Sequence, residues 1–188
     1  MAKNILVTYA VKGEMVDFKG TDDEFYYLFT GIGKMKSTYY LSNFIHQFVP
    51  DLVLNIGSAG TAVHQIGDVF VCHRFIDRDM RKLANIGIES EIDTSALLNR
   101  YGFGSSWMND GICNTGDSFV TEHSNLEGDV IDMEAYAQAF VCRTMEVPFV
   151  SIKYVTDIIG HNSVNSWEEK LVDAQKGLTE FFEKNHVY

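Results

Sequence analysis

Acidic side chains follow several of the apolar runs in this sequence. Glu14 comes shortly after the first apolar run, and Asp157 follows the last strand-like run. Asp132 and Glu134 lie in an otherwise apolar stretch that leads into a helical pattern. Carboxyl groups can give or take a proton and can stabilise a developing positive charge, so these four are candidates for acid–base chemistry. Asp132, Glu134 and Asp157 also fit a purely structural role, because acidic residues cap turns and helix N-termini.

Two further segments have the composition of ligand-binding turns. Residues 57–61 read GSAGT, and residues 115–120 read TGDSFV. Glycine and other small residues let the backbone approach a ligand closely and present its amides as donors. For the first segment, a plain tight turn without a ligand is an equally good interpretation.

Several common site motifs are missing. Residues 31–34, GIGK, lack the spacing and the hydroxyl residue of a phosphate-binding loop, and no G-x-G-x-x-G follows the first apolar run. Ser58 lies in GSAG and not in the G-x-S-x-G of a hydrolase elbow. The six histidines form no close pair of the kind that binds zinc. We therefore expect no metal and no cofactor.

Composition limits the possible partners. The chain has 188 residues, of which 46% are hydrophobic, and a formal net charge of -11. This charge repels phosphate backbones and anionic membranes, so neither nucleic acid nor a membrane is expected as a partner. No run has the length of a membrane span or the pattern of a signal peptide. The three cysteines are far apart and fit no disulfide framework. We expect a soluble, cytoplasmic protein that binds a neutral or zwitterionic small molecule.

The pattern of apolar residues predicts an α/β fold. Short continuous apolar runs are typical of strands buried on both faces, and spacings of three and four indicate helices. The expected strands are 4–9, 25–30, 52–56, 67–72 and 148–155, and the expected helices are 34–48, 133–145 and 167–184. Residues 77–104 are polar, and we expect a long loop there. The chain is predicted to form one domain over residues 1–188, with a mixed, mostly parallel central sheet flanked by helices. Ligands of such sheets bind beyond the carboxyl ends of the strands, where the segments described above are found.

Taken in order, five motifs resemble the superfamily of purine nucleoside phosphorylases and methylthioadenosine/S-adenosylhomocysteine nucleosidases. The similarity spans nearly the whole chain. The motifs are GIGK at 31–34, NIGSAG at 55–60 with GDV at 67–69, TGDSF at 115–119, DMEA at 132–135 and VTD at 155–157. Five ordered motifs are far more specific than any one of them.

The resemblance implies a role for each candidate carboxylate. Asp157 would be the general acid at purine N7, and a raised pKa from partial desolvation would suit that role. Glu134 would bind the ribose hydroxyls and stabilise the oxocarbenium-like sugar, and Glu14 would orient and deprotonate the attacking water. Asp132 would support its turn without touching the substrate.

The remaining site residues are also implied by the resemblance. Phe119 would stack on the base and the Val120 main chain would read its edge. The other substrate-binding candidates are Ser58, Ala59 and Gly60 beside base and sugar, Met133 against the sugar, Thr156 beside Asp157, and Val11, Ile32 and Trp167 in an apolar pocket for the 5' substituent. Val11, Ile32 and Trp167 are equally well explained as core residues.

The choice between water and phosphate as nucleophile depends on which charges are present. A phosphorylase needs fixed cations for its dianion. The phosphorylases that this chain resembles carry an arginine where Asn55 stands and another near Lys12 to Glu14. A carboxylate at position 14 repels phosphate, so the resemblance favours hydrolysis, although Lys12 or a neighbouring subunit's arginine could still support phosphorolysis. A non-catalytic nucleoside-binding protein is the third alternative.

Some features depart from the family pattern. The segments between Glu14 and Gly31 and after Phe75 are shorter than usual, and Lys153 replaces a common arginine. Methylthioadenosine, adenosylhomocysteine, futalosine and a plain purine nucleoside all remain open as substrates. The resemblance also implies a homodimer, in which a neighbour's loop completes the 5' pocket.

Overall fold

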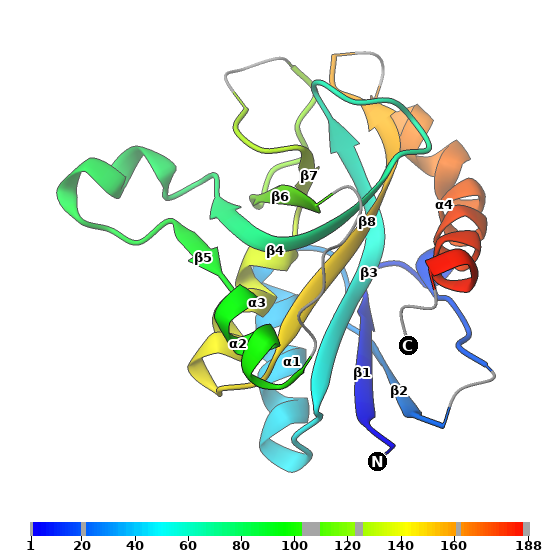
Figure 1. The fold of residues 1–188 in the computed structure, drawn as a ribbon. Helices are drawn as coiled ribbons and strands as arrows, with labels where there is room; N and C mark the ends of the chain where they lie inside the picture. Colours follow the sequence, from blue (N-terminus) through cyan, green and yellow to red (C-terminus); the bar gives the residue numbers. More distant parts are fainter. Residues whose placement is uncertain (1, 20–21, 103–109, 123–125, 161–162, 186–188) are drawn as a thin grey trace.

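A central sheet with helices on both sides forms the structure, a computed structural model that describes residues 2–19, 22–102, 110–122, 126–160 and 163–185 (Figure 1). Within 163–169 only the backbone is described. The elements are β1 (Asn4–Tyr9), η1 (Lys12–Glu14), β2 (Glu24–Phe29), α1 (Lys34–Gln47), β3 (Leu52–Thr61), β4 (Val69–Asp77), η2 (Arg81–Ile86), β5 (Glu91–Asp93), α2 (Ser95–Arg100), β6 (Asp110–Thr115), β7 (Val130–Asp132), α3 (Ala135–Thr144), β8 (Phe149–Ile158) and α4 (Ser163–Asn185).

The sheet is mixed and mostly parallel, which confirms the predicted fold class. β1 pairs in parallel with β2 and β3, and β3 pairs in parallel with β8. From β8 the pairing continues through β4, β6 and β7 and returns to β3, so five strands close a ring. β1, β3 and β8 run in the same direction, and their carboxyl ends therefore lie at one edge.

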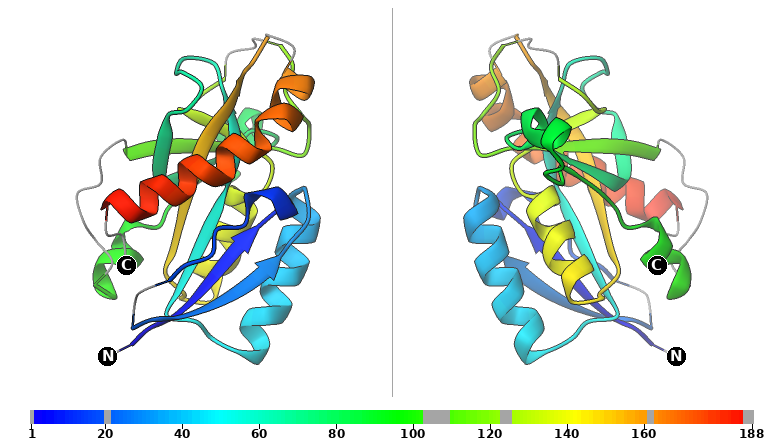
Figure 2. Two further views of the ribbon diagram at one scale, coloured as in Figure 1. Left: turned by 90° about the vertical axis from the view of Figure 1, so that its right-hand side faces the viewer. Right: turned by 90° about the vertical axis from the view of Figure 1, so that its left-hand side faces the viewer.

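The central strands are buried on both faces because their alternate residues enter two different apolar clusters. On β1, Leu6 belongs to the cluster beneath α1 and α3, whereas Ile5 and Val7 belong to the cluster beneath α4. On β3, Val53 belongs to the cluster beneath α1 and α3, and Leu54 belongs to the cluster beneath α4. The two side views show α1 and α3 on one face of the sheet and α4 crossing the other (Figure 2).

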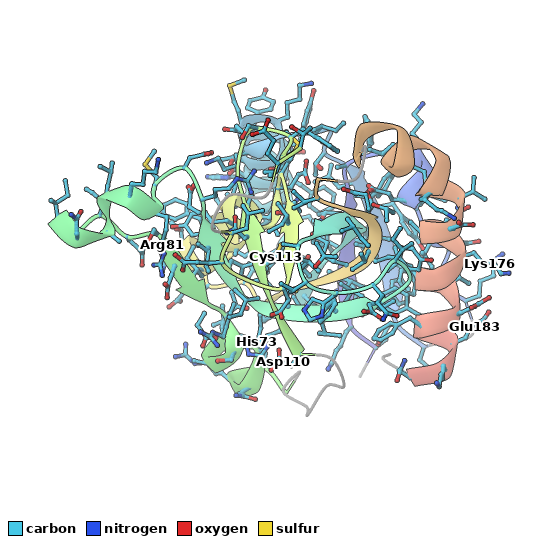
Figure 3. The ribbon with its side chains drawn as sticks, turned by 90° about the horizontal axis from the view of Figure 1, so that it is seen from above. His73, Arg81, Asp110, Cys113, Lys176 and Glu183 are labelled. Atoms are coloured by element: carbon cyan, nitrogen blue, oxygen red, sulfur yellow. The ribbon has the colours of Figure 1, made fainter. Side chains whose placement is uncertain are left out.

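Helix α4 is amphipathic and covers its face with one stripe of side chains. Ala174, Leu178 and Phe182 are buried, and their spacing of four residues places them on one side of the helix. Lys176 and Glu183 point outward (Figure 3). Within the described residues, no helix is both long enough and apolar enough to cross a membrane.

Strand β3 is longer than the sequence predicts. Residues 57–61 continue the strand, whereas the sequence indicates a turn there. The prediction is wrong because pairing with β8 extends to Thr61, and the tertiary contact outweighs the low strand propensity of glycine. The register shifts between Ala59 and Gly60, which is a β-bulge beside the site.

Residues 77–104 contain regular structure, and the long loop predicted there is wrong. β5 pairs with β4, and both Ile92 on β5 and Leu98 on α2 are buried. Such short elements are stabilised by tertiary contacts and leave little periodicity in the sequence. The segment from η2 to β5 projects from the body as an arm (Figure 1).

Candidate active site

A cavity of about 300 Å³ lies at the carboxyl ends of β1, β3 and β8. It is lined by side chains and backbone from six separate segments, in keeping with the position of ligand sites in parallel sheets. The lining residues are Ala10, Val11, Glu14, Ile32, Ser58, Ala59, Gly60, Ser118, Phe119, Val120, Ile131, Asp132, Met133, Glu134, Asp157 and Ile159.

Glu14 is held rigidly at the wall of this cavity. Its side chain is buried, with only 3% of the residue exposed. Oε1 accepts hydrogen bonds from the Ser58 amide at 2.9 Å and from the Ser58 hydroxyl at 2.6 Å, and Oε2 accepts one from the Val11 amide at 3.0 Å. These three donors fix the orientation of the carboxyl group. Gly57 makes room for it, since a Cβ there would lie 3.3 Å from Glu14 Oε1.

Asp157 lies opposite Gly60 across the β3–β8 pairing, at the bulge. It is 3% exposed, and its Oδ1 accepts a hydrogen bond from the Thr156 hydroxyl at 3.0 Å. The same hydroxyl is 3.3 Å from the carbonyl oxygen of Ala59, so Thr156 connects the acid to the neighbouring strand. Thr156 does not line the cavity but contacts the residue that does.

Glu134 stands at the start of α3 and faces the start of α1. Its Oε1 accepts a hydrogen bond from the Gly33 amide at 2.9 Å. Burial raises the pKa of Glu134 to about 8, and neighbouring Asp132 and Glu14 act in the same direction, whereas Lys153 and the Gly33 amide act against it.

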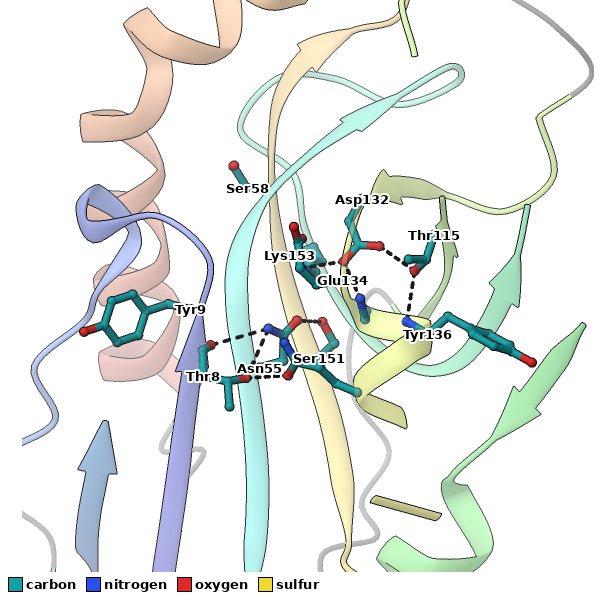
Figure 4. A network of polar contacts seen from close by, with 12 residues as sticks. Thr8, Tyr9, Asn55, Ser58, Thr115, Asp132, Glu134, Tyr136, Ser151 and Lys153 are labelled. Atoms are coloured by element: carbon teal, nitrogen blue, oxygen red, sulfur yellow. Dashed lines mark hydrogen bonds and ion pairs between the residues drawn. The ribbon is translucent and has the colours of Figure 1, made fainter. Parts of the chain in front are cut away.

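A buried ion pair supports the loop that carries Glu134. Lys153 Nζ is 2.9 Å from Asp132 Oδ2, and both side chains are almost fully buried. Asp132 also accepts hydrogen bonds from the Thr115 hydroxyl and from the amide of Ala135, the first residue of α3 (Figure 4). Burial alone would raise the pKa of Asp132, but Lys153 and Thr115 together hold it below its usual value. The sequence gives no sign of this pair, because its members come from different strands.

Asn55 takes no part in the cavity. It is buried between β1 and β8, where its amide donates to the Thr8 hydroxyl at 3.2 Å and its carbonyl accepts from Ser151 at 2.7 Å (Figure 4). Lys12 is exposed and does not line the cavity.

Most of the residues named from the sequence come together here. Twelve of them line the cavity: Glu14, Glu134, Asp157, Ser58, Ala59, Gly60, Phe119, Val120, Met133, Val11, Ile32 and Asp132, the last of which was expected only to support its turn. The side chain of Trp167 lies outside the described residues. The sequence missed Ala10, Ile131 and Ile159, which are neighbours of named residues, and it named Ser118 only as part of the segment 115–120.

A sequence profile places the chain in a known family. A profile of the phosphorylase superfamily matches residues 10–184, and the chain belongs to this superfamily. The resemblance inferred from the five motifs is thereby confirmed.

The similar proteins are nucleosidases. The chain is 29% identical over 167 residues to 5'-methylthioadenosine/S-adenosylhomocysteine nucleosidase of Marinomonas sp., covering 76% of this chain and 71% of the relative. It is 29% identical to the enzyme of the same name from Staphylococcus carnosus, covering 80% and 76%.

Solved structures share the fold. The Helicobacter pylori 5'-methylthioadenosine/S-adenosylhomocysteine nucleosidase with butyl-thio-DADMe-Immucillin-A superimposes with a TM-score of 0.79 at 22% identity, covering 97% of both chains. The futalosine hydrolase of the same organism gives 0.77 at 20% identity, covering 97% and 96%.

Proposed function

We propose that this protein hydrolyses the N-glycosidic bond of a purine nucleoside of the 5'-methylthioadenosine or S-adenosylhomocysteine kind, with water as the nucleophile. The observation that carries the proposal is that no cationic side chain is found among the described residues that line the cavity. Four of its lining residues are acidic, Glu14, Asp132, Glu134 and Asp157, and none of the described lining residues is a lysine or arginine. A dianionic phosphate would find no cation among these residues and would be repelled by the carboxylate of Glu14, whereas water needs no cation to bind.

The two residues considered for phosphate binding also argue for water. Asn55 bonds to Thr8 and Ser151 beneath the cavity, and Lys12 is exposed outside it. Lys153 is a cation near the site, but its charge is matched by Asp132. Phosphorolysis would therefore need a cation from elsewhere.

In the proposed mechanism each carboxyl group acts on a different part of the substrate. Asp157 donates its proton to N7 as the bond between C1' and N9 breaks, so the base leaves neutral. Glu134 holds the ribose hydroxyls. Glu14 accepts a proton from water as the water oxygen bonds to C1', and the products are a free base and a free sugar.

The other lining residues would hold the rest of the nucleoside. Phe119 is 40% exposed and lines the cavity, where its ring would stack on a purine with the Val120 main chain at the edge of the base. Met133 would lie against the sugar, with Ser58 and Gly60 opposite. Val11 and Ile32, with Trp167, would face the 5' substituent.

A base-release assay tests the proposal. Purified protein is incubated with methylthioadenosine, adenosylhomocysteine, futalosine or inosine, with and without phosphate. We expect base release without phosphate, and release that strictly requires phosphate would assign the protein to the phosphorylases. Binding without cleavage under either condition would identify a nucleoside-binding protein. Asp157→Asn should abolish most turnover while the fold persists, and near-normal turnover in this variant would exclude Asp157 as the acid.

We further propose a homodimer. The arm and α1 expose apolar side chains that a monomer leaves in water, among them Met35, 79% exposed, and Ile86, 70% exposed. Sedimentation velocity should give twice the chain mass, and Ile86→Glu should weaken the association. A monomeric wild-type protein would contradict this proposal. A cytoplasmic location stays a prediction from the sequence.

A further inference from the structure

Arg78 lies directly behind the segment proposed to hold the base. It follows β4 without a break, and its amide donates to the Thr115 carbonyl at 2.8 Å. Its guanidinium donates through Nη2 to the Ser118 carbonyl at 2.7 Å and through Nη1 to Asn114 Oδ1 at 3.1 Å. Ser118 directly precedes Phe119, so this hydrogen bond acts one residue from the ring that would stack on the base.

The segment from Ser118 to Val120 is a thin wall between two cavities. Ser118 and Val120 line the active-site cavity, and both also line a second cavity that Arg78 borders. Arg78 does not line the active-site cavity. The position of the wall therefore depends on what supports it from the side of Arg78.

Gly116 and Arg78 fit together closely. A Cβ on Gly116 would lie 2.6 Å from Arg78 Cζ, and the next two closest atoms also belong to the guanidinium. The φ angle of Gly116 is not positive, so an alanine there would be limited by the guanidinium and not by backbone strain. The guanidinium lies against the bare backbone of the turn, and this arrangement exists only because the turn has a glycine.

The neighbouring residue of the turn is fixed from another direction. The Lys34 amide donates to Asp117 Oδ1 at 2.9 Å, and the Asp117 amide donates to Asp79 Oδ2 at 2.9 Å. Since the preceding amide, that of Gly33, binds Glu134, the first turn of α1 connects the base side to the ribose side. Movement of Ser118 and Phe119 relative to this anchor is then limited by Arg78.

We propose that Arg78 is a positioning residue for base recognition, which sets the place of Phe119 and Val120 through its contacts with Gly116 and Ser118. The inference rests on the proposed function, because it takes the Phe119 side of the cavity as the base subsite. Arg78 itself does not touch the substrate. Its loss should weaken binding of the base and leave the sugar side unchanged.

The test separates base binding from sugar binding. Arg78→Ala, Arg78→Lys and the control Arg143→Ala are compared with wild type for binding of adenine and of 5-methylthioribose by calorimetry, and for kcat and KM with methylthioadenosine. Arg143 is a matched control because its guanidinium pairs with Glu89 at the surface. Arg78→Ala should weaken adenine binding and raise KM about tenfold, with 5-methylthioribose binding and kcat changed less than about threefold. The adenine affinity of Arg78→Lys should lie between those of wild type and Arg78→Ala, since lysine keeps the positive charge but lacks the planar guanidinium.

A double-mutant cycle tests the contact itself. Gly116→Ala displaces the guanidinium and should weaken adenine binding as Arg78→Ala does, whereas adding Gly116→Ala to Arg78→Ala should cost little more. If Arg78→Ala folds poorly in a thermal melt, Gly116→Ala and Arg78→Lys still test the contact. Adenine affinity within about twofold of wild type in Arg78→Ala or Gly116→Ala, or equal loss for adenine and 5-methylthioribose, would overturn the proposal. If wild type binds adenine but cleaves no nucleoside, the proposed function fails while the role of Arg78 still stands. If wild type does not bind adenine, the role of Arg78 fails, while the proposed function is still decided by the base-release assay.

Discussion

Gly60 and Asp157 face each other across β3 and β8, and a Cβ on Gly60 would lie 2.9 Å from Asp157 Oδ2. The strand thus leaves space for a carboxyl group where any other residue would place a side chain. The bulge at Ala59 and Gly60 produces this pairing, because the register shift brings Asp157 opposite Gly60.

Gly60→Ala should displace Asp157 while the sheet stays paired. We expect kcat/KM to fall about 10²-fold, since small displacements of a catalytic group have effects of that size. Steady-state kinetics measures the fall in kcat/KM, and a thermal melt checks that the sheet stays folded. Gly57→Ala is the comparison, since its Cβ would meet Glu14 at the less severe distance of 3.3 Å. A Gly60→Ala enzyme as active as wild type would show that Asp157 does not need this position.

Glu134 makes stability depend on pH. Burial raises the pKa of Glu134 from the usual 4.5 to about 8 in the folded protein. The contribution of its protonated form to the free energy of unfolding is therefore complete below the pKa of the unfolded chain, and it is lost as pH rises through the pKa of the folded protein. Glu134→Gln stays neutral, so it should be more stable than wild type by on the order of 3 kcal/mol near pH 9 and about equal near pH 5. Urea denaturation at both pH values measures this difference.

The control for this experiment is Glu183→Gln, which removes an exposed carboxylate from α4. It should change stability little at either pH. If Glu134→Gln gave the same difference from wild type at both pH values, the raised pKa would be disproved.

Glu14→Gln should impair the chemical step. The amide cannot take a proton from water, and its NH₂ group meets the Val11 amide or the Ser58 donors, which now bond to the carboxylate. We expect single-turnover cleavage to slow about 10²-fold or more. Ser58→Ala removes one donor and should have a smaller effect. Cleavage by Glu14→Gln at the wild-type rate would contradict the role of Glu14 in activating water.

Lys153→Met should destabilise the protein by about 3–5 kcal/mol, because it leaves Asp132 buried without its partner. The double variant Lys153→Met, Asp132→Asn removes both charges and should recover much of that loss. Denaturant titration of the single and double variants gives the coupling free energy. Equal destabilisation in the two variants would mean that the buried charge is not the cause.

The sequence by itself determined the fold class and the edge of the sheet where the site lies. Continuous apolar runs at 4–9, 52–56 and 148–155 report burial on both faces, and helical spacing reports one buried stripe. These are local patterns, so one chain suffices to read them. The order of the five motifs was likewise enough to indicate the superfamily.

Only the tertiary structure decided which distant residues meet. Gly33 and Glu134 are 101 positions apart, and their hydrogen bond depends on how α1 and α3 pack. The pairing of Lys153 with Asp132 follows from strand order, which periodicity does not encode. For the same reason the sequence could not show that Asn55 bonds to Ser151 and takes no part in the cavity, or that the glycine at 116 leaves space for the guanidinium of Arg78, which follows β4.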